Sequence, residues 1–293
     1  MSRIAYVNGQ YLPHSKGFVH IEDRGYQFAD GVYEVFAVHN GKLIGVKGHM
    51  DRLDHSLSEL RIDWPMQRGP FMLVVTEVVR RNHVKNGLVY IQVTRGVARR
   101  DHPFPKDCIS SMVVTAKKMP PMDKKALCKG IGVITIPDIR WKRKDIKSVS
   151  LLPNCLGKQQ AREAGAFEAW MIDENGMVTE GTSTNAWIVT KDGELITRDV
   201  SKAILNGITR LAIVEAATQA GITISERAFS EQEALDAKEA FISSSTSHVK
   251  AVTRINEMPV GNGHVGEMTT RLLDLYVDLI ETKGGPEHTD RWN

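Results

Sequence analysis

The spacing of hydrophobic positions predicts helices and strands mixed along the whole chain. Apolar residues recur every three or four positions between Met50 and Leu60, which is the period of an amphipathic helix. Runs rich in β-branched and aromatic residues, such as GLVYIQVTRG, indicate strands instead. We expect strands over residues 87–96, 111–116, 130–136, 167–173, 185–190 and 239–245. We expect helices over residues 50–60, 71–79, 208–220 and 268–279.

Three short motifs predict turns between these elements. Asn8-Gly9 and Asn40-Gly41 each separate two apolar segments, and this dipeptide is a strong signal for a two-residue β-hairpin turn. GNGHVG, residues 261–266, matches the glycine pattern of dinucleotide-binding folds. Too little chain follows it for the strand and the acidic residue that such a fold needs. We therefore interpret it as a turn before the last helix.

The composition changes near residue 120. KKMPPMDKK, residues 117–125, contains two prolines, is rich in lysine and has no hydrophobic period, so it predicts a linker. We expect an α+β fold of two domains, a smaller one over residues 1–118 and a larger one over residues 124–293, joined by residues 119–123. The final residues, KGGPEHTDRWN, are expected to be frayed.

The composition also narrows the classes of function. The chain has 293 residues and a net charge of only +3 with both signs interspersed, which disfavours a nucleic-acid partner. Three scattered cysteines, and histidines His49 and His55 six positions apart, predict neither a disulfide framework nor a metal site. No apolar run approaches the roughly 18 residues of a membrane helix, and the N-terminus lacks an apolar leader. We expect a cytoplasmic protein with reduced cysteines.

The most charged segment is DIRWKRKDIKSVS, residues 138–150, in which seven of ten consecutive positions are charged. A solvated basic surface is the plain interpretation. Binding to nucleic-acid phosphates is the weaker one, because Trp141 is the only aromatic residue among the charges and no recognition motif accompanies them. Charge density alone does not separate a surface lysine from a reactive one.

Two motifs in the second half indicate a possible anion site. The helix expected to begin after Gly207 would offer the free N–H groups of Ile208 and Thr209 to an anion. The hydroxyl-rich turn over residues 243–247 is a second source of donors. Taken alone, each motif is better explained as an ordinary N-cap or an ordinary serine turn. Glu180, among small hydroxyl residues, is either a solvated turn carboxylate or a partner for a cationic ring nitrogen.

Seven motifs occur in an order that resembles the fold-type IV pyridoxal-phosphate enzymes, and within them the D-amino acid aminotransferases. They are EDRGYQFADGVYEV (22–35), HMDRL (49–53), YIQVTRG with RRDHPFP (90–105), DIRWKRKDIKS (138–148), VTEGTSTNAW (178–187), ILNGITR (204–210) and FISSSTS (241–247). The resemblance extends over nearly the whole chain. It implies a two-domain α+β fold with pyridoxal 5′-phosphate between the domains, and a homodimer. This cofactor requires a reactive lysine, a carboxylate for its ring nitrogen and a phosphate site.

The resemblance also implies roles for individual residues. Lys147 would form the Schiff base with the cofactor and then carry a proton during catalysis. Because burial favours the neutral amine, we expect Lys147 to be buried. Glu180 would hold the proton on the ring nitrogen, and Arg140 would lie near the cofactor. The other implied cofactor contacts are Arg52, Leu205, Gly207, Ile208, Thr209, Ser244 and Ser245. The three basic residues between Trp141 and Asp145 are expected to be solvated.

The loop RGVARRDHPFP carries the implied substrate specificity. Arg100 and His102 match the R-x-H that, with Tyr33, binds the substrate carboxylate in D-amino acid aminotransferases. Thr246 is a further expected substrate contact. In the resembled family this loop reaches the active site of the neighbouring subunit. A charged surface loop is the plain alternative, and pairing with Asp101 would redirect Arg100.

The expected reaction transfers the amino group of a D-amino acid such as D-alanine to a 2-keto acid such as 2-oxoglutarate, with ping-pong kinetics. The same fold serves aminodeoxychorismate lyases, branched-chain L-aminotransferases and (R)-amine transaminases, so fold alone does not decide the substrate. A lyase would use the same Lys147 and Glu180 but no second keto acid. The expected partners are small molecules and a second subunit, with no nucleic acid and no membrane.

Overall fold

The computed structural model describes residues 3–286, which divide into two compact units. The first unit contains the chain up to Met122 together with Ile146–Ser150. The second contains Asp123–Asp145 and the chain from Leu151 onward. The expected frayed tail falls largely on residues 287–293, which lie outside the described residues.

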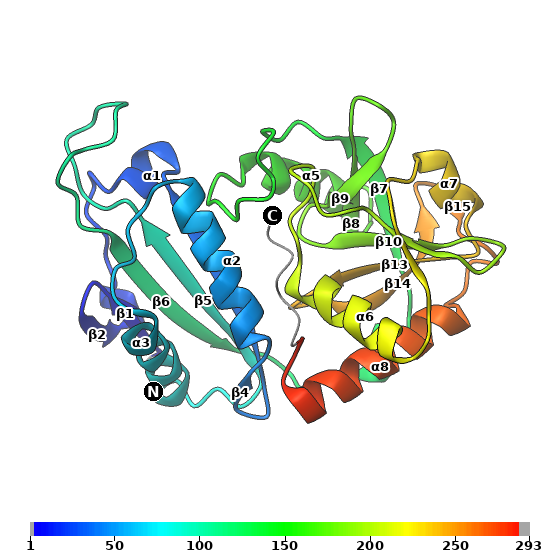
Figure 1. Cartoon of the computed structure of the whole chain (residues 1–293), viewed down its shortest axis with the longest axis horizontal. Helices are drawn as coiled ribbons and strands as arrows, with labels where there is room; N and C mark the ends of the chain where they lie inside the picture. The colour runs from blue at the N-terminus through cyan, green and yellow to red at the C-terminus, as the bar shows by residue number, and fades with distance from the viewer. Residues whose placement is uncertain (1–2, 287–293) are drawn as a thin grey trace. The chain divides into compact units, whose positions relative to one another are not determined.

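The first unit is built on a six-stranded antiparallel sheet (Figure 1). Its strands, in spatial order, are β2 (Gln10–Pro13), β1 (Ile4–Val7), β6 (Ser111–Lys118), β5 (Gly87–Thr94), β3 (Gly31–His39) and β4 (Lys42–Leu43). The hairpins β1–β2 and β3–β4 turn at Asn8-Gly9 and Asn40-Gly41. All four turn residues have positive φ, as this turn type requires, so both predicted hairpins are confirmed.

Two helices cover one face of this sheet and close its hydrophobic core. They are α2 (Val46–Glu59) and α3 (Arg68–Arg81), and both overlap helices that the periodicity predicted (Figure 1). Because strand side chains alternate, Val32 and Phe36 of β3 face this core, and so does Glu34 between them. A short helix, α1 (Arg24–Phe28), and a 3-10 turn (His14–Lys16) precede β3.

The second unit is built on a nine-stranded mixed sheet. Its main path runs β12 (Ile224–Glu226), β11 (Leu195–Thr197), β10 (Asn185–Val189), β13 (Glu239–Ser244), β14 (His248–Ile255), β7 (Ile131–Pro137), β8 (Glu168–Ile172) and β9 (Val178–Gly181), with β15 (Met258–Pro259) beside β14. The pairs β11–β12, β14–β7 and β7–β8 are parallel, and the other pairs are antiparallel.

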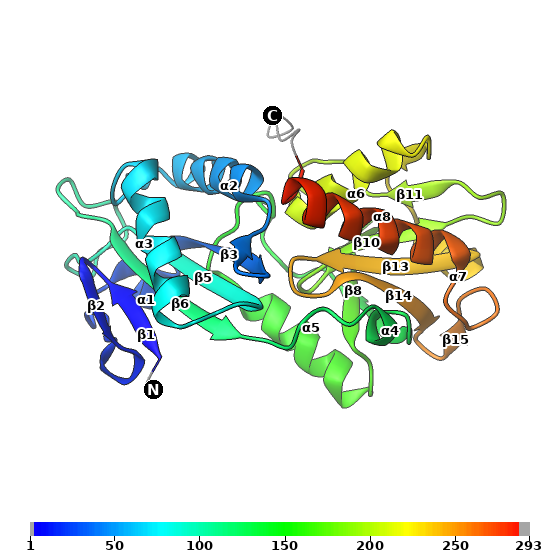
Figure 2. The same cartoon turned by 90° about the horizontal axis from the view of Figure 1, so that it is seen from below.

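Five helices accompany this sheet: α4 (Lys124–Leu127), α5 (Leu152–Glu163), α6 (Ile208–Gln219), α7 (Glu231–Asp236) and α8 (Glu267–Lys283). Figures 1 and 2 show α6 and α8 side by side over β10 and β13. On those strands the rings of Trp187 and Phe241 are fully buried and stack with their centroids 5.2 Å apart. GNGHVG forms the turn before α8, as expected.

The segment that carries Lys147 differs from the expected domain division. We expected Lys147 in the larger C-terminal domain, but Ile146–Ser150 packs in the first unit. The backbone explains this, because the segment pairs with the start of β3. Tyr33 N–H donates to the Lys147 carbonyl at 3.0 Å, and Val149 N–H donates to the Gly31 carbonyl at 3.0 Å. The chain therefore returns to the first unit for five residues.

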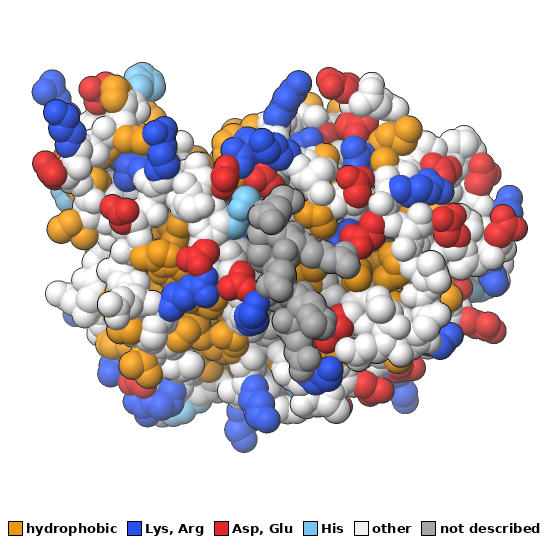
Figure 3. Space-filling model, viewed as in Figure 1, with side chains coloured by type: hydrophobic (Ala, Val, Ile, Leu, Met, Phe, Trp, Pro, Cys, Tyr) orange, Lys and Arg blue, Asp and Glu red, His pale blue; other side chains and the backbone are white. Residues whose placement is uncertain are grey.

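Helix α5 was missed by the periodicity. Its sequence, LPNCLGKQQARE, buries only Gly157 and Ala161 and has no wide apolar stripe. The surface carries charges of both signs, interspersed over the face shown in Figure 3. Among residues 3–286, no helix combines the length and the apolar character needed to cross a membrane.

Candidate functional site

Lys147 lies in the first unit, with its amine over an aromatic ring. Its backbone N–H donates to Ser56 Oγ of α2 at 3.1 Å, and its carbonyl pairs with β3. Its Nζ lies 4.2 Å from the centroid of the Tyr33 ring. The side chain is half-buried rather than buried as we expected. The structure thus brings together two residues that the sequence assigned to the same site, because both lie where the segment 146–150 pairs with β3.

A second tyrosine also packs against Tyr33. Tyr90 of β5 stacks on Tyr33 with a centroid distance of 5.7 Å and donates its hydroxyl to Gln92 Oε1 at 2.8 Å. Burial, and then the neighbouring phenol of Tyr33, raise the pKa of Tyr90 to about 12. Tyr90 therefore stays neutral and fixes the plane of the ring that faces the Lys147 amine.

Arg52 belongs to a buried cluster between β3 and α2. Its Nε and Nη2 donate to the two carboxylate oxygens of Glu34 at 2.7 and 2.8 Å, and His49 Nδ1 lies 2.6 Å from Glu34 Oε2. Burial opposes ionisation of Glu34, but the charge of Arg52 and the hydrogen bonds from Arg52 and His49 hold the pKa of Glu34 far below its usual range. Burial lowers the pKa of His49 despite Glu34. Two of the three guanidinium nitrogens of Arg52 are thus oriented by a carboxylate.

The loop of Arg100 and His102 is exposed but held in place. Arg24 of α1 donates to the carbonyl oxygens of Asp101 and His102 at 2.6 and 3.3 Å. The Phe28 ring lies 5.1 Å from the Arg100 guanidinium and 5.7 Å from the imidazole of His102. The carboxylate of Asp101 accepts the N–H of His102 at 2.8 Å. Arg100 and His102 are therefore presented together on one fixed loop.

Glu180 lies in the second unit, where a polar shell surrounds its buried carboxylate. Arg140 Nη1 donates to Oε1 at 2.5 Å, and Asn185 Nδ2 donates to Oε2 at 3.2 Å. The Leu205 N–H lies 3.2 and 3.1 Å from the two oxygens. Burial raises the pKa of Glu180 above its usual value, and Arg140 and the Leu205 N–H oppose that rise. Glu180 is a buried acceptor rather than a solvated turn residue.

Arg140 is in turn held by Asp138, which the sequence analysis did not single out. Nε and Nη2 of Arg140 donate to the two oxygens of Asp138 at 3.0 and 2.8 Å. Thr179 Oγ1 donates to Asp138 Oδ2 at 2.8 Å. Lys144, which we expected to be solvated, places Nζ 3.1 Å from Asp138 Oδ2 with only 12% of its side chain exposed. The charged segment therefore contains an inward-facing network.

The start of α6 forms a cradle of backbone donors. Gly207 precedes the helix and supplies no side-chain cap, and Ile208 and Thr209 begin it with both side chains buried. A Cβ on Gly207 would clash with Asn185 Oδ1, so the close packing there requires glycine. The Thr209 side chain hydrogen-bonds Tyr276, whose pKa burial raises to about 12. A phosphate would fit these donors, since a helix N-terminus favours an anion.

The turn between β13 and β14 contains the remaining predicted contacts of the second unit. Ser244 and Ser245 are half-buried and Thr246 is exposed. Ser244 Oγ accepts the Ser247 N–H at 3.0 Å and lies 3.4 Å from Thr246 Oγ1. The turn is ordered by its own hydroxyl groups. With the Glu180 carboxylate and the α6 amides, the second unit supplies donor and acceptor types that fit a phosphorylated pyridine.

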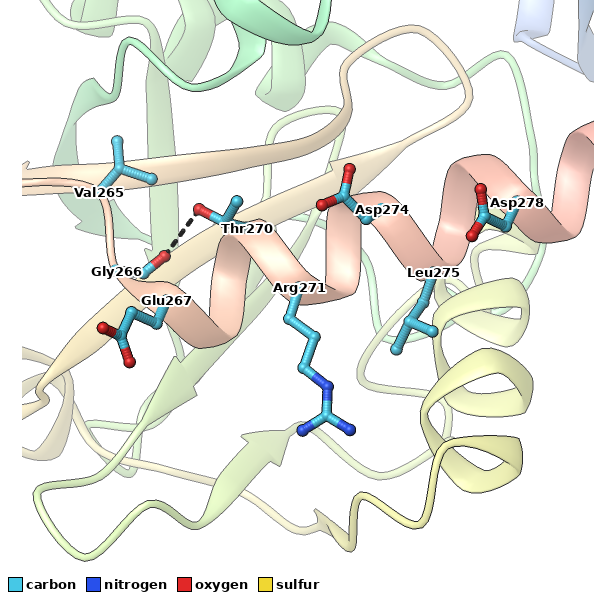
Figure 4. A pocket seen from close by; sticks show the side chains of 8 residues that line it. All are labelled: Val265, Gly266, Glu267, Thr270, Arg271, Asp274, Leu275 and Asp278. Atoms are coloured by element: carbon cyan, nitrogen blue, oxygen red, sulfur yellow. Dashed lines mark hydrogen bonds between the residues drawn. The ribbon is translucent and has the colours of Figure 1, made fainter.

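Two hollows elsewhere contain none of the predicted residues. One, of about 440 Å³, lies along α8 and is lined by Val265, Gly266, Glu267, Thr270, Arg271, Asp274, Leu275 and Asp278 (Figure 4). The other, of about 600 Å³, lies in the first unit beside Asn8 and Ile109. Among the described residues, no group of three histidine, cysteine or acidic side chains could hold a metal ion.

Sequence reasoning missed four residues of these clusters: Glu34, His49, Asp138 and Asn185. His49 was considered only as a zinc ligand. Asp138 stands two positions before Arg140, and Asn185 five positions after Glu180, so both spacings were present in the quoted motifs. Glu34 carried the clearest signal, because an acidic residue at an inward position of a strand requires a buried partner.

Comparisons with known proteins show what the chain is similar to. A model of the family described as amino-transferase class IV matches residues 31–255. The D-alanine aminotransferase of Bacillus licheniformis is 41% identical over 263 residues, which is 89% of this chain and 92% of that protein. The D-alanine aminotransferase of Staphylococcus haemolyticus is 37% identical over 279 residues, which is 95% of this chain and 98% of that protein.

The fold has close counterparts among solved structures. The branched-chain amino acid aminotransferase from Escherichia coli superposes with a TM-score of 0.86 at 22% identity, over 100% of this chain and 98% of that one. These matches confirm the predicted family, the α+β fold of fold-type IV, the transaminase chemistry and the pyridoxal phosphate cofactor. The chain belongs to the class IV aminotransferases.

Proposed function

We propose that this aminotransferase moves the amino group of a D-amino acid such as D-alanine to a 2-keto acid such as 2-oxoglutarate. The loop of Arg100 and His102 is the observation that carries the proposal. Arg24 fixes its backbone, and Phe28 contacts both side chains, so a guanidinium and an imidazole are offered together. A substrate carboxylate is the group that such a pair of donors binds. The two relatives named as D-alanine aminotransferases support the same substrate.

The residues of the second unit are proposed to hold the cofactor. Pyridoxal phosphate supplies an aldehyde for an amine and a ring that accepts electrons. The Glu180 carboxylate keeps a proton on the ring nitrogen, and the Leu205 and Asn185 donors orient that carboxylate. The N–H groups of Ile208 and Thr209 bind phosphate oxygens, together with hydroxyls of the turn at Ser245. Leu205, half-buried beside Glu180, packs against the ring.

The residues of the first unit are proposed to perform the proton transfer. Lys147 Nζ would hold pyridoxal phosphate, which would supply the aldehyde, and as a free amine Lys147 would take the proton from the substrate α-carbon. The Tyr33 ring holds this amine at 4.2 Å, and the hydroxyl of Tyr33 adds a donor for the substrate carboxylate. Arg52, oriented by Glu34, binds the cofactor phosphate. The amino group would stay with the cofactor until a keto acid accepts it, with Lys147 supplying the proton to the new α-carbon, so we expect ping-pong kinetics.

We further propose a homodimer in the cytoplasm. Phe18, Ile21 and Tyr26 are 78%, 76% and 77% exposed, an apolar segment that a second subunit would cover. The exposed loop of Arg100 would then reach the partner's substrate. The three cysteines, each an unpaired thiol, are typical of a reducing compartment. Light scattering on the purified protein tests the dimer, and a monomeric mass at micromolar concentration would contradict it.

The substrate assignment has a direct spectroscopic test. The purified protein, loaded with pyridoxal phosphate, is mixed with D-alanine or L-alanine without a keto acid. We expect D-alanine alone to bleach the visible absorbance and to release pyruvate in an amount equal to the protein. Bleaching by L-alanine alone would overturn the proposal in favour of an L-aminotransferase. Bleaching by neither enantiomer would overturn the assignment of alanine as the amino donor.

A further inference from the structure

We propose that Asp138 is a positioning residue that, through Arg140, holds Glu180 in place as an oriented carboxylate. This inference rests on the proposed function, in which Glu180 meets the ring nitrogen of the cofactor. Asp138 itself touches neither cofactor nor substrate in this assignment. It acts on the reaction through the guanidinium that it anchors.

The geometry of the network supports a chain of three residues. Asp138 accepts Nε and Nη2 of Arg140, so the guanidinium plane is fixed from one side. The remaining nitrogen, Nη1, then points to Glu180 Oε1 at 2.5 Å. Exposed fractions of the three side chains are 0% for Asp138, 8% for Arg140 and 6% for Glu180. Water therefore screens these charges little, and each hydrogen bond fixes a direction.

Asp138 is itself held at a point where it cannot swing away. Thr179 Oγ1 donates to Asp138 Oδ2 at 2.8 Å, and Lys144 Nζ lies 3.1 Å from the same oxygen. Burial opposes ionisation of Asp138, but its bonds to Arg140, with those to Thr179 and Lys144, hold its pKa well below the usual range. Thr179 immediately precedes Glu180 on β9. The hydroxyl that holds Asp138 and the carboxylate that Arg140 meets therefore come from adjacent positions of one strand.

Arg140 is the main group that opposes protonation of Glu180. Burial raises the pKa of Glu180, and Arg140 is the largest influence that opposes this rise, followed by the Leu205 N–H. The negative charge of Asp138 also raises it. Asp138 thus acts on Glu180 in two opposite ways. Its own charge favours the protonated acid, whereas its hold on Arg140 favours the carboxylate. The hold of Asp138 on Arg140 is the larger of the two effects.

Because the two effects have opposite sign, the direction in which the Glu180 titration midpoint moves in an Asp138 variant tests the proposal, in the protein without cofactor. The side-chain carboxyl carbons of glutamate are labelled with ¹³C, and the signal of Glu180 is identified by its loss in Glu180→Gln. Its chemical shift is followed by NMR against pH in the natural protein and in Asp138→Asn, Arg140→Met and Arg140→Lys. The matched control is Arg143→Met, because Arg143 pairs with Asp145 at 3.0 and 2.8 Å in the same segment.

We expect Arg140→Met to raise the titration midpoint of Glu180 by about one to two pH units, since an opposite charge in contact shifts a carboxyl by that order. Asp138→Asn should raise it by a smaller amount, because an amide cannot accept both guanidinium bonds. Arg143→Met should leave it unchanged. A lower or unchanged midpoint in Asp138→Asn would overturn the positioning role. If Arg140→Met does not fold, Arg140→Lys takes its place. We expect Arg140→Lys to raise the titration midpoint of Glu180 by a smaller amount, and an unchanged midpoint would contradict the role of Arg140.

A second measurement separates this inference from the proposed function. Uptake of pyridoxal phosphate is titrated by absorbance, and the pH dependence of the visible band is compared between the natural protein and Asp138→Asn. We expect the band of Asp138→Asn to change at a different pH, because the ring nitrogen faces an altered carboxylate. An identical pH profile would contradict the inference. A natural protein that takes up no cofactor would refute the proposed function, while the NMR titration would still decide the role of Asp138.

Discussion

The two units each bury an arginine against a glutamate, yet the pKa values of the two glutamates are shifted in opposite directions. Glu34 in the first unit uses both oxygens for Arg52 and one for His49, and its pKa is lowered. Glu180 in the second unit receives a single guanidinium nitrogen, because Asp138 holds the other two, and its pKa is raised. The same pair of residue types therefore gives opposite results.

The difference shows how a buried carboxylate is reserved for a ligand. A bidentate arginine satisfies a carboxylate and leaves little for another cation to add. Glu180 instead meets one guanidinium nitrogen, one amide and one backbone N–H, and a second carboxylate lies behind its arginine. It therefore still gains from a cationic partner such as a protonated ring nitrogen. Glu34 joins β3 to α2, whereas Glu180 remains available for binding.

The largest expected effect comes from removing the charge of Glu180. Glu180→Gln should lower transaminase turnover by about 10²- to 10⁴-fold, the usual contribution of a residue that controls a proton. Its thermal stability should change little, because glutamine can still accept the Leu205 N–H. The measurement is steady-state turnover of D-alanine with 2-oxoglutarate, beside a melting curve. Near-normal turnover with intact cofactor binding would place the ring nitrogen elsewhere.

Glu34→Ala should instead act mainly on the fold. Removing one partner from a buried ion pair typically costs about 3–5 kcal/mol, because Arg52 would be left buried without its carboxylate. We expect the free energy of unfolding, measured with urea, to fall by that order. The Glu180→Gln variant is the control, because it should lower turnover with little change in stability, whereas Glu34→Ala should lower mainly stability. Equal loss of stability in both would remove the distinction drawn between the two glutamates.

Arg100→Ala should impair carboxylate substrates selectively. Loss of a charge-assisted hydrogen bond costs about 1.5–3 kcal/mol, or roughly 10- to 100-fold in kcat/KM for D-alanine. Any slow turnover of a primary amine that has no carboxylate should be unchanged. Arg99→Ala, in the neighbouring position of the same loop, is the matched control. Equal losses for both substrates would mean that the carboxylate is bound elsewhere.

The smallest effects are expected in the pH dependence of stability without cofactor. Because the pKa of Glu34 is lowered on folding, its contribution is present above the unfolded value near 4.5 and is lost as the pH falls below it. Because the pKa of Glu180 is raised, the folded state holds an extra proton just above 4.5, and stability falls there as the pH rises. Each slope reaches at most about 1.4 kcal/mol per pH unit.

These slopes can be separated by urea unfolding of the two neutral variants between acidic and neutral pH. Glu34→Gln should flatten the loss of stability below pH 4.5, and Glu180→Gln should flatten the decline above it. The two changes have opposite sign. A flattening in the same pH range for both variants would show that the two carboxylates ionise alike.

The elements with a clear period were predictable from the sequence. Both hairpins follow from Asn-Gly, because few other residues accept positive φ at both turn positions. Helices α2, α3, α6 and α8 overlap the predicted segments, with boundaries that differ by a few residues. Helix α5 was missed because its buried side is made of glycine and alanine. The formation of this helix depends on packing against the sheet, and the hydrophobic period of its own sequence does not reveal that packing.

In the site, too, some residues could be predicted from the sequence and others could not. Motifs named Lys147, Glu180 and Arg52, and these assignments remain predictions until the variants are measured. Which side chains these three residues meet followed from no local pattern. Glu34 meets His49 and Arg52 only because β3 packs under α2. Lys144 is partly buried only because Asp138 turns inward. The prediction from charge density, that Lys144 would be solvated, was therefore wrong.

By itself the sequence determined the family, the α+β composition and the residue types available for transaminase chemistry, because motifs and hydrophobic periods are local properties. The tertiary structure alone decided which unit holds Lys147 and in which direction the pKa of each buried carboxylate shifts. Pairing with β3 places Lys147 in the first unit, and contacts across 40 positions join Arg140 to Glu180. A pKa depends on burial and on the charges nearby in space, and only the folded chain brings those together.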